Sequence, residues 1–106
     1  MLHAGDVFFA NLDPVRGTEQ QGIRLVVVIS VVSLGPRAIV VPLTTKPRNW
    51  PTRINVTLHG ITAQAMCEQV RAVDVSRLQP DLYGRISPAI LAEIQQTVAN
   101  LIGVYN

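Results

Sequence analysis

The sequence predicts a small, mostly β protein, an antiparallel sheet or barrel (α+β) with one helix at the C-terminus. Three observations predict this fold class. The apolar runs are short, turn residues that include 7 Gly and 7 Pro separate them at a spacing of about ten residues, and only the end of the chain has helical periodicity. At 106 residues, 48% of them hydrophobic, the chain is expected to form one domain over residues 1–106.

Three strands are predicted in the first half of the chain. The apolar residues 7–10 form the first strand, which ends at an Asp-Pro turn. Residues 24–32 are almost wholly aliphatic and β-branched, which predicts a central strand covered on both faces. A turn over residues 33–36 leads into the third strand, residues 38–43, and joins the two strands as a hairpin.

The second half adds a loop, two strands and a short helical turn. Residues 46–51 contain two prolines, which exclude a central strand. Residues 53–58 alternate polar and apolar side chains and predict a strand with one wet face, and residues 65–73 are a further candidate strand. Residues 74–78 predict a short helical turn, so the sheet is expected to have about five strands.

The one clear helix begins after Ser87, the predicted N-cap, with Pro88 at the first helical position. Ile86 is placed to pack against Leu91 as a hydrophobic staple, and Gly103 ends the helix. The apolar positions of the helix form one stripe, made of Ile90, Leu91, Ile94, Val98, Leu101 and Ile102.

Charge and cysteine content limit the classes of function. The formal charge of +2 permits an anionic partner without requiring one. Cys67 is the only cysteine and is interpreted as a buried strand residue of a reduced protein, with a reactive thiol as the alternative. The sequence has no cluster of Asp, His and Cys that would predict a metal site, and it has no P-loop or dinucleotide-binding motif that would predict a cofactor. Without a signal sequence or an apolar run long enough to span a membrane, a cytoplasmic location is expected.

Arg24 and Thr44 are the strongest candidates for a catalytic site. Arg24 lies near the start of the second predicted strand and Thr44 follows the third, so antiparallel pairing brings both to the same end of the hairpin. A guanidinium and a hydroxyl can hold a phosphate between them, and Arg24 would stabilise the charge that develops on it. The alternative is that both are ordinary strand-end residues.

The loop over residues 13–22 is long for a hairpin connection, which favours a mobile binding loop. Its Thr18, Glu19 and Gln20 offer donors and acceptors that can read base edges. The alternative is plain solvation of these side chains.

A second candidate surface lies in the loop after the third strand. Lys46, Arg48 and Trp50 combine cations with an aromatic ring, as proteins do when they bind single-stranded nucleic acid. The alternative is that Trp50 packs the loop against the protein. If residues 65–73 form one strand, Gln69 and Arg71 share a face that can line a groove.

Four sequence blocks, in this order, resemble the MazF/PemK toxins of bacterial toxin-antitoxin modules. They are GDVFFANLDPVRGTEQQGIR, LVVVIS, AIVVPLTT and EQVRAVDVSRL, followed by the amphipathic helix. The resemblance covers nearly the whole chain. It implies a small SH3-like antiparallel β-barrel of the CcdB/PemK type with a C-terminal helix, and a homodimer.

The resemblance implies a metal-independent, sequence-specific endoribonuclease, or mRNA interferase, that cleaves single-stranded RNA by attack of the ribose 2′-hydroxyl on the adjacent phosphate. The catalytic Arg and Thr of the family fall on Arg24 and Thr44. The positions that contact RNA in the family fall on Glu19, Gln20, Glu68 and Gln69. Thr18, Thr45 and Lys46 are further predicted RNA-binding residues. No cofactor is implied, and the protein partner would be a cognate, MazE-like antitoxin with a disordered tail.

The sequence departs from the family at two points. Leu25 stands where the family commonly has Pro, and the connection over residues 33–37 is shorter than in many members. Neither departure removes a catalytic group. The alternative functions are a non-catalytic toxin of the same fold that binds a protein such as DNA gyrase, as the CcdB toxins do, and an RNA-binding domain that does not cut. The CcdB toxins depend on a Trp near the C-terminus, which this chain lacks, and they lack the Arg/Thr pair.

Overall fold

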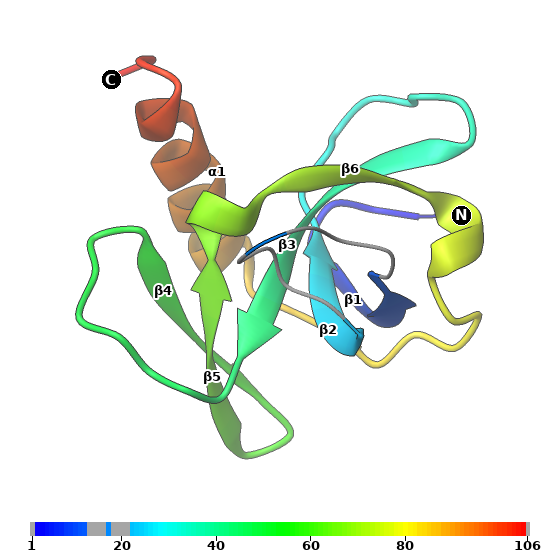
Figure 1. The fold of residues 1–106 in the computed structure, drawn as a ribbon, viewed down its shortest axis with the longest axis horizontal. Helices are drawn as coiled ribbons and strands as arrows, with labels where there is room; N and C mark the ends of the chain where they lie inside the picture. Colours follow the sequence, from blue (N-terminus) through cyan, green and yellow to red (C-terminus); the bar gives the residue numbers. More distant parts are fainter. Residues whose placement is uncertain (1, 13–16, 18–21, 106) are drawn as a thin grey trace.

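A computed structural model describes residues 2–12, 17 and 22–105 (Figure 1). These residues form seven strands, one α-helix and two short 3-10 turns. In chain order they are β1 (Asp6–Asn11), β2 (Ile23–Val28), β3 (Arg37–Thr44), β4 (Arg53–Leu58), β5 (Ile61–Met66), η1 (Cys67–Gln69), β6 (Arg71–Asp74), η2 (Val75–Arg77), β7 (Gly84–Arg85) and α1 (Pro88–Leu101).

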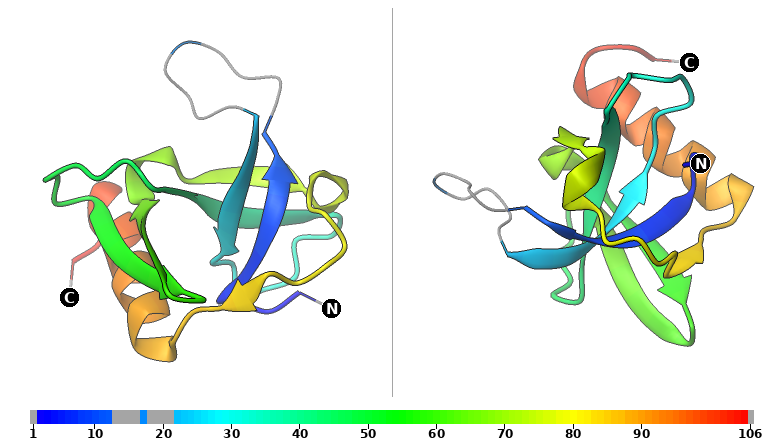
Figure 2. Two further views of the ribbon diagram at one scale, coloured as in Figure 1. Left: turned by 90° about the horizontal axis from the view of Figure 1, so that it is seen from below. Right: turned by 90° about the vertical axis from the view of Figure 1, so that its right-hand side faces the viewer.

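The strands form one antiparallel sheet with the order β4-β5-β3-β2-β1-β7, and β6 pairs with β3 beside this path. The long strand β3 is shared between two partners. Its first half, from Arg37 to Val40, pairs with β6, and its last residues, Leu43 and Thr44, pair with β5. Because these two partners follow each other along β3, the sheet curls into a half-barrel, with α1 on one side of the curl (Figure 2). The predicted mostly β fold with a C-terminal helix is confirmed.

Alternation along the strands divides the apolar residues between the two faces of the sheet. On β2 and β3 the odd-numbered residues, such as Val27 and Val41, belong to the core cluster that includes Ile94 of α1. The even-numbered residues, such as Val26 and Val40, belong to a second cluster with Phe8. The central strands are therefore covered on both faces, as their continuous apolar sequence predicted.

The strand predicted over residues 24–32 is shorter than expected, because β2 ends at Val28. Beyond it, the Ile29 N–H still donates to the Ile39 carbonyl at 2.9 Å, and side chains replace the backbone partners of the next groups. The Ser30 hydroxyl accepts from the Ile39 N–H at 3.2 Å, and the Ile29 carbonyl accepts from Gln95 of α1 at 3.0 Å. These bonds satisfy the backbone while the chain leaves the sheet. A nearby hydroxyl and a helix side chain that is distant in sequence therefore replace backbone partners where this strand ends.

The prediction of one strand over residues 65–73 was wrong, because η1 (Cys67–Gln69) separates β5 from β6. This break lets the chain leave one section of β3 and return to pair with another. Cys67 is fully buried as expected, but it begins the 3-10 turn rather than lying in a strand. The break and the two-residue strand β7 raise the strand number from about five to seven. The short helical turn predicted over residues 74–78 is confirmed as η2.

The start of α1 follows its sequence signals. The Ser87 hydroxyl accepts from the Ile90 N–H at 3.2 Å, with Pro88 at the first helical position. Ile94 is fully buried, but the last two members of the predicted stripe, Leu101 and Ile102, are 46% and 77% exposed. The stripe therefore extends past the sheet that it covers. In the described part of the chain, no helix has the length and apolarity needed to cross a membrane.

Candidate active site

The candidate site is built on the end of the β2–β3 hairpin that is opposite its turn. Val26 pairs with Pro42, and Val27 pairs with Val41. Continuing this register by two residues sets Arg24 opposite Thr44, and by alternation both side chains belong to the face of the sheet that holds the second core cluster. Thr44 is 8% exposed, and Arg24 is half-buried. The sequence expectation that the two residues share one end of the hairpin agrees with this register.

The Thr44 hydroxyl has a defined orientation. Its Oγ1 accepts a hydrogen bond from the Lys46 backbone N–H at 3.1 Å. A hydroxyl has one proton and two lone pairs, so accepting this bond leaves its proton available to donate to another group. Thr44 therefore presents a donor at the open end of the hairpin, while the exposed Thr45 and Lys46 continue the chain into the loop.

Gln64, which the sequence analysis did not identify, lies beside Thr44. It is the register partner of Thr44 on β5. Its Oε1 accepts from the Arg48 N–H at 2.9 Å, and its Nε2 donates to the Arg48 carbonyl at 3.3 Å. The side-chain amide of Gln64 thus binds both the N–H and the carbonyl of Arg48. These two bonds fix this part of the β3–β4 loop next to the strand that carries Thr44. The only sequence signal was a polar residue at an alternate position of a strand.

Two arginines hold the end of β1 near this site. Arg71 Nη1 donates to the Leu12 carbonyl at 3.3 Å, and Arg77 Nη1 donates to the Asn11 carbonyl at 3.2 Å. The predicted RNA-contacting residues Thr18, Glu19 and Gln20 lie outside the described residues. Because residues 68–70 are not in a strand, the shared strand face that was predicted for Gln69 and Arg71 does not form.

Glu68 is bound within the protein. Its carboxylate accepts from Arg53 Nη2 at 2.7 Å and Nε at 2.9 Å, and from the Thr52 hydroxyl at 2.7 Å. The Arg53 side chain is only 6% exposed. Partial burial alone would raise the pKa of Glu68, but the hydrogen bonds from Arg53 and Thr52 hold it below its ordinary value. The carboxylate therefore has an internal role in orienting Arg53, in addition to any contact with a ligand. Gln69, in the same turn, is half-buried.

The Cys67 thiol is not suited to act as a nucleophile. Burial, with a smaller effect of the neighbouring Glu68, raises its pKa to about 12. Because the thiolate is the reactive form, the thiol stays protonated and inert at neutral pH. The predicted burial of Cys67 is confirmed, although the residue lies in η1 and not in a strand.

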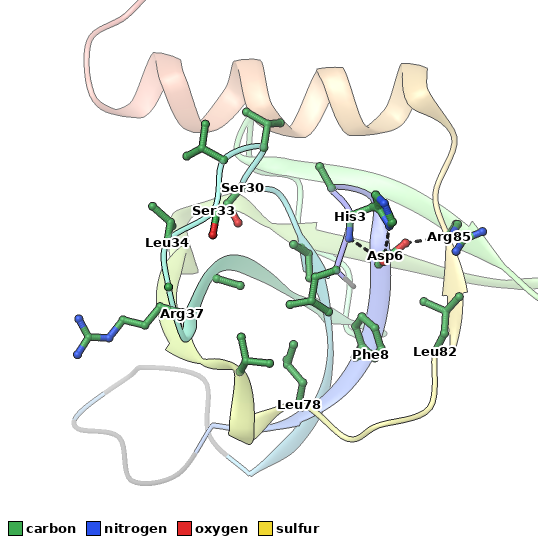
Figure 3. Close-up of a pocket in the computed structure, with 18 of the residues that line it drawn as sticks. His3, Asp6, Phe8, Ser30, Ser33, Leu34, Arg37, Leu78, Leu82 and Arg85 are labelled. Atoms are coloured by element: carbon green, nitrogen blue, oxygen red, sulfur yellow. Dashed lines mark hydrogen bonds and ion pairs between the residues drawn. The ribbon is translucent and has the colours of Figure 1, made fainter.

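The large hollow of the structure lies at the other end of the hairpin. It has a volume of about 1060 Å³ and is lined by residues of the N-terminal segment, the β2–β3 turn and the chain between η2 and β7. Figure 3 shows Phe8, Leu34, Leu78 and Leu82 around it, with Asp6 at its edge. Asp6 Oδ1 accepts from Arg85 Nε at 3.0 Å, so this carboxylate is also held internally. Neither Arg24 nor Thr44 lines the hollow.

The fold defines the class of protein, the MazF-like half-barrels. The crystal structure of MazF from Deinococcus radiodurans superposes with a TM-score of 0.85 at 20% identity and covers 97% of both chains. An endoribonuclease from Mycobacterial species in complex with its cognate antitoxin superposes with a TM-score of 0.80 at 20% identity, covering 97% of this chain and 96% of that chain. A further neighbour is a MazE-MazF complex from Deinococcus radiodurans, with a TM-score of 0.79 at 18% identity and 97% and 96% coverage.

Sequence relatives specify the family. Endoribonuclease EndoA of Bacillus subtilis is 36% identical over 87 residues, which are 74% of this chain and 75% of the relative. Endoribonuclease MazF of Staphylococcus saprophyticus is 29% identical over 114 residues, covering 99% of this chain and 94% of the relative. The family described as PemK-like, MazF-like toxin of type II toxin-antitoxin system matches residues 3–102. The chain belongs to this family of toxins, and it is a homologue of endoribonucleases over nearly its full length.

Proposed function

We propose that this protein is a toxin that cleaves single-stranded RNA at specific sequences, as a metal-independent endoribonuclease that acts in the cytoplasm as one domain over residues 1–106. The observation that supports the proposal is the register of β2 and β3, whose extension by two residues beyond Val26 and Pro42 sets Arg24 opposite Thr44 on one face of the sheet. Both residues are set by strands, so their side chains are preorganised around a position that a phosphate can occupy. The endoribonuclease relatives support the choice of RNA as substrate.

The proposed reaction needs no nucleophile from the protein. The 2′-oxygen of the ribose attacks the adjacent phosphorus and forms a new O–P bond, and the bond from phosphorus to the 5′-oxygen of the next nucleotide breaks. The 2′-hydroxyl proton is lost, and the leaving oxygen gains a proton. The products are a 2′,3′-cyclic phosphate and a 5′-hydroxyl end. RNA is required, because DNA has no 2′-hydroxyl.

Arg24 and Thr44 would stabilise the phosphorane that forms during this attack. The guanidinium stays protonated at neutral pH, so Arg24 supplies charge and hydrogen-bond donors to the phosphorane oxygens rather than acting as a base. Thr44 donates its hydroxyl proton to the same group, since the bond from the Lys46 N–H uses one lone pair of its oxygen and not the proton. The two residues thus act on charge that is greater in the transition state than in the substrate.

The RNA would extend on both sides of this pair. We assign contacts with it to the RNA-binding residues predicted from the sequence, which are Thr18, Glu19, Gln20, Thr45, Lys46, Glu68 and Gln69. We also propose that the protein is a homodimer that a cognate MazE-like antitoxin inhibits. The solved toxin-antitoxin complexes of the same fold support such a partner.

The test is incubation of the purified protein with a long single-stranded RNA in EDTA, followed by mapping of cut sites and end groups. We expect cuts at one short motif, with 5′-hydroxyl ends, that disappear in Arg24→Ala. Arg37→Ala, at the other end of the hairpin, is the matched control and should cut as the wild type does. Absence of cutting by folded wild-type protein would contradict the proposal and favour a toxin that binds a protein such as DNA gyrase.

A further inference from the structure

Trp50 occupies an unusual position on the surface of the β3–β4 loop. It is the only tryptophan of the chain, and 46% of it is exposed. Two guanidinium groups lie over its ring, with Arg48 Cζ at 4.8 Å and Arg53 Cζ at 4.7 Å from the ring centroid. Contacts of this kind are attractive because a cation interacts favourably with the face of an aromatic ring. The result is a stack of one indole and two guanidinium groups that is open to solvent.

This stack is held from both sides. On one side, Arg53 is fixed by Glu68, which receives hydrogen bonds from two nitrogens of its guanidinium. On the other side, the backbone of Arg48 is fixed by both polar groups of Gln64. A loop that contains two prolines and is anchored at two points loses little conformational entropy when a ligand binds to it.

The stack is also joined to the candidate catalytic residues. Gln64, which holds Arg48, is the register partner of Thr44, and the Lys46 N–H bonds to the Thr44 hydroxyl. The loop therefore leads directly from Thr44 to Trp50. A nucleic-acid strand with one phosphate at Thr44 would meet Lys46, Arg48 and Trp50 in succession if it ran along this loop.

We propose that Trp50 and Arg48 form a stacking platform for a base of the RNA that flanks the cleaved phosphate, and that Glu68 positions this platform through Arg53. Bases stack on indole rings and on guanidinium planes, and such stacking tolerates any base because each has a π face. The platform would thus increase the affinity for RNA and fix the position of the strand, but it would not determine the sequence that is cleaved. This inference rests on the proposed function, because it takes the RNA strand at Thr44 as given.

The alternative is that Trp50 only covers the ion pair between Arg53 and Glu68. This alternative explains fewer of the observed contacts than a stacking role does. The buried member of the stack is Arg53, whose side chain is 6% exposed, whereas Trp50 keeps nearly half of its surface in solvent. Arg48 is exposed and makes no ion pair with a described carboxylate. A cover would need neither the second cation nor the bonds between Gln64 and Arg48.

The fluorescence of the single tryptophan provides a direct test. The protein is titrated with a mixed-sequence 2′-O-methyl RNA oligonucleotide, which lacks the 2′-hydroxyl nucleophile and is not cut, while anisotropy of a label on the oligonucleotide reports binding separately. We expect saturable quenching of Trp50 with the same midpoint as the anisotropy change. Binding without a change in Trp50 fluorescence, or no binding at all, would overturn the platform.

Variants separate stacking from structure. Trp50→Ala should weaken binding of the oligonucleotide about ten-fold, and Trp50→Phe should recover most of the loss, since it restores an aromatic face. Arg48→Gln should weaken binding, whereas Arg37→Gln, an equal change of charge on another part of the surface, should weaken it less. Circular dichroism of each variant controls for folding. Equal binding by folded Trp50→Ala and wild-type protein would overturn the proposal.

The outcomes also distinguish this inference from the proposed function. Once the cleavage motif is mapped, Trp50→Ala should slow cutting of a long RNA more than it slows cutting of a substrate trimmed to the motif. If wild-type protein cuts RNA but Trp50 is not quenched, the nuclease is established and the platform is wrong. If Trp50 is quenched but RNA is never cut, the protein binds RNA at the platform and the catalytic proposal fails.

Discussion

The two ends of the β2–β3 hairpin differ in shape and in the groups that they present. The turn end, with Ser30 and Arg37 at its borders, surrounds the hollow of about 1060 Å³, which is lined by apolar side chains together with polar and charged ones such as Asp6. The open end, about 23 Å away along β3, carries Arg24, Thr44 and the anchored β3–β4 loop, and neither Arg24 nor Thr44 lines that hollow. Chemistry on a phosphate needs oriented charge and donors, and these lie at the open end.

The size of a hollow and the chemical groups that make a binding site are therefore separate properties of this molecule. A large pocket is the usual first hypothesis for a binding site, because small ligands need enclosure. A single-stranded polymer needs a row of exposed cations, donors and stacking surfaces instead. The open end fits the second description, with Thr44, Lys46, Arg48 and Trp50 in sequence along one loop.

The largest expected effect is at Arg24. Arg24→Ala should lower the rate of RNA cleavage about 10³-fold, because it removes the main charge that stabilises the phosphorane. The variant should unfold in urea within about 0.5 kcal/mol of the wild type, since Arg24 is not part of either core cluster. Single-turnover cleavage and urea unfolding measure the two quantities. A rate close to that of the wild type would remove Arg24 from the mechanism.

A substitution at the turn end of the hairpin should change the free energy of unfolding and leave RNA cleavage unchanged. Phe8 is 7% exposed and belongs to the second core cluster, so Phe8→Ala should lower the free energy of unfolding by about 3 kcal/mol. Cleavage per folded molecule should stay unchanged. Urea unfolding and cleavage at a temperature where the variant is folded test both parts. Strong loss of cleavage in the folded variant would mean that the two ends are coupled.

Thr44 should have a smaller effect on catalysis than Arg24. Thr44→Val keeps the shape of the side chain but removes the hydroxyl, and should slow cleavage about 100-fold. Thr44→Ser, which keeps the hydroxyl, is the control and should retain most of the rate. The measurement is single-turnover cleavage with saturating protein. Equal rates for the Val and Ser variants would show that the hydroxyl takes no part.

The ion pair between Glu68 and Arg53 should make the free energy of unfolding depend on pH. Glu68 titrates near 4.5 in the unfolded chain, and its pKa is lower in the folded protein. The unfolded state therefore binds more protons in this range, so the stabilisation is complete above about pH 4.5 and is lost as the pH falls through the folded-state pKa. Urea unfolding between pH 7 and pH 3 should show this loss.

Glu68→Gln should be less stable than the wild type at pH 7, and the difference should shrink as the pH falls below 4.5. Glu93→Gln, an exposed change on α1, is the matched control. A difference that stays constant with pH would show that the Glu68 carboxylate does not stabilise the fold through its charge.

The smallest expected effect is that of metal removal. In the described part of the chain, no three His, Cys, Asp or Glu side chains are grouped so as to hold a metal ion. We expect EDTA to leave the cleavage rate unchanged, and the comparison of rates with and without added Mg²⁺ measures this. Loss of cleavage in EDTA that Mg²⁺ restores would contradict the proposed chemistry at the open end.

Local sequence signals predicted the elements whose ends are set locally. The helix start at Ser87 and Pro88 and the strand β4 from Arg53 to Leu58 are examples, because capping and alternation act within a few residues. The end of β2 at Val28 could not be read in the same way, because Gln95, 66 residues away from Ile29, helps to set it. The same holds for η1, whose place depends on how β5 and β6 share β3.

For the candidate site, the sequence alone determined the pair of Arg24 and Thr44 and the residues of the Trp50 loop, because strand alternation and hairpin pairing follow from local pattern. Only the tertiary structure decided that Gln64 lies beside Thr44 and that Glu68 is bound to Arg53. These contacts join residues of different strands. No periodicity specifies which polar groups meet, since that depends on the curl of the whole sheet.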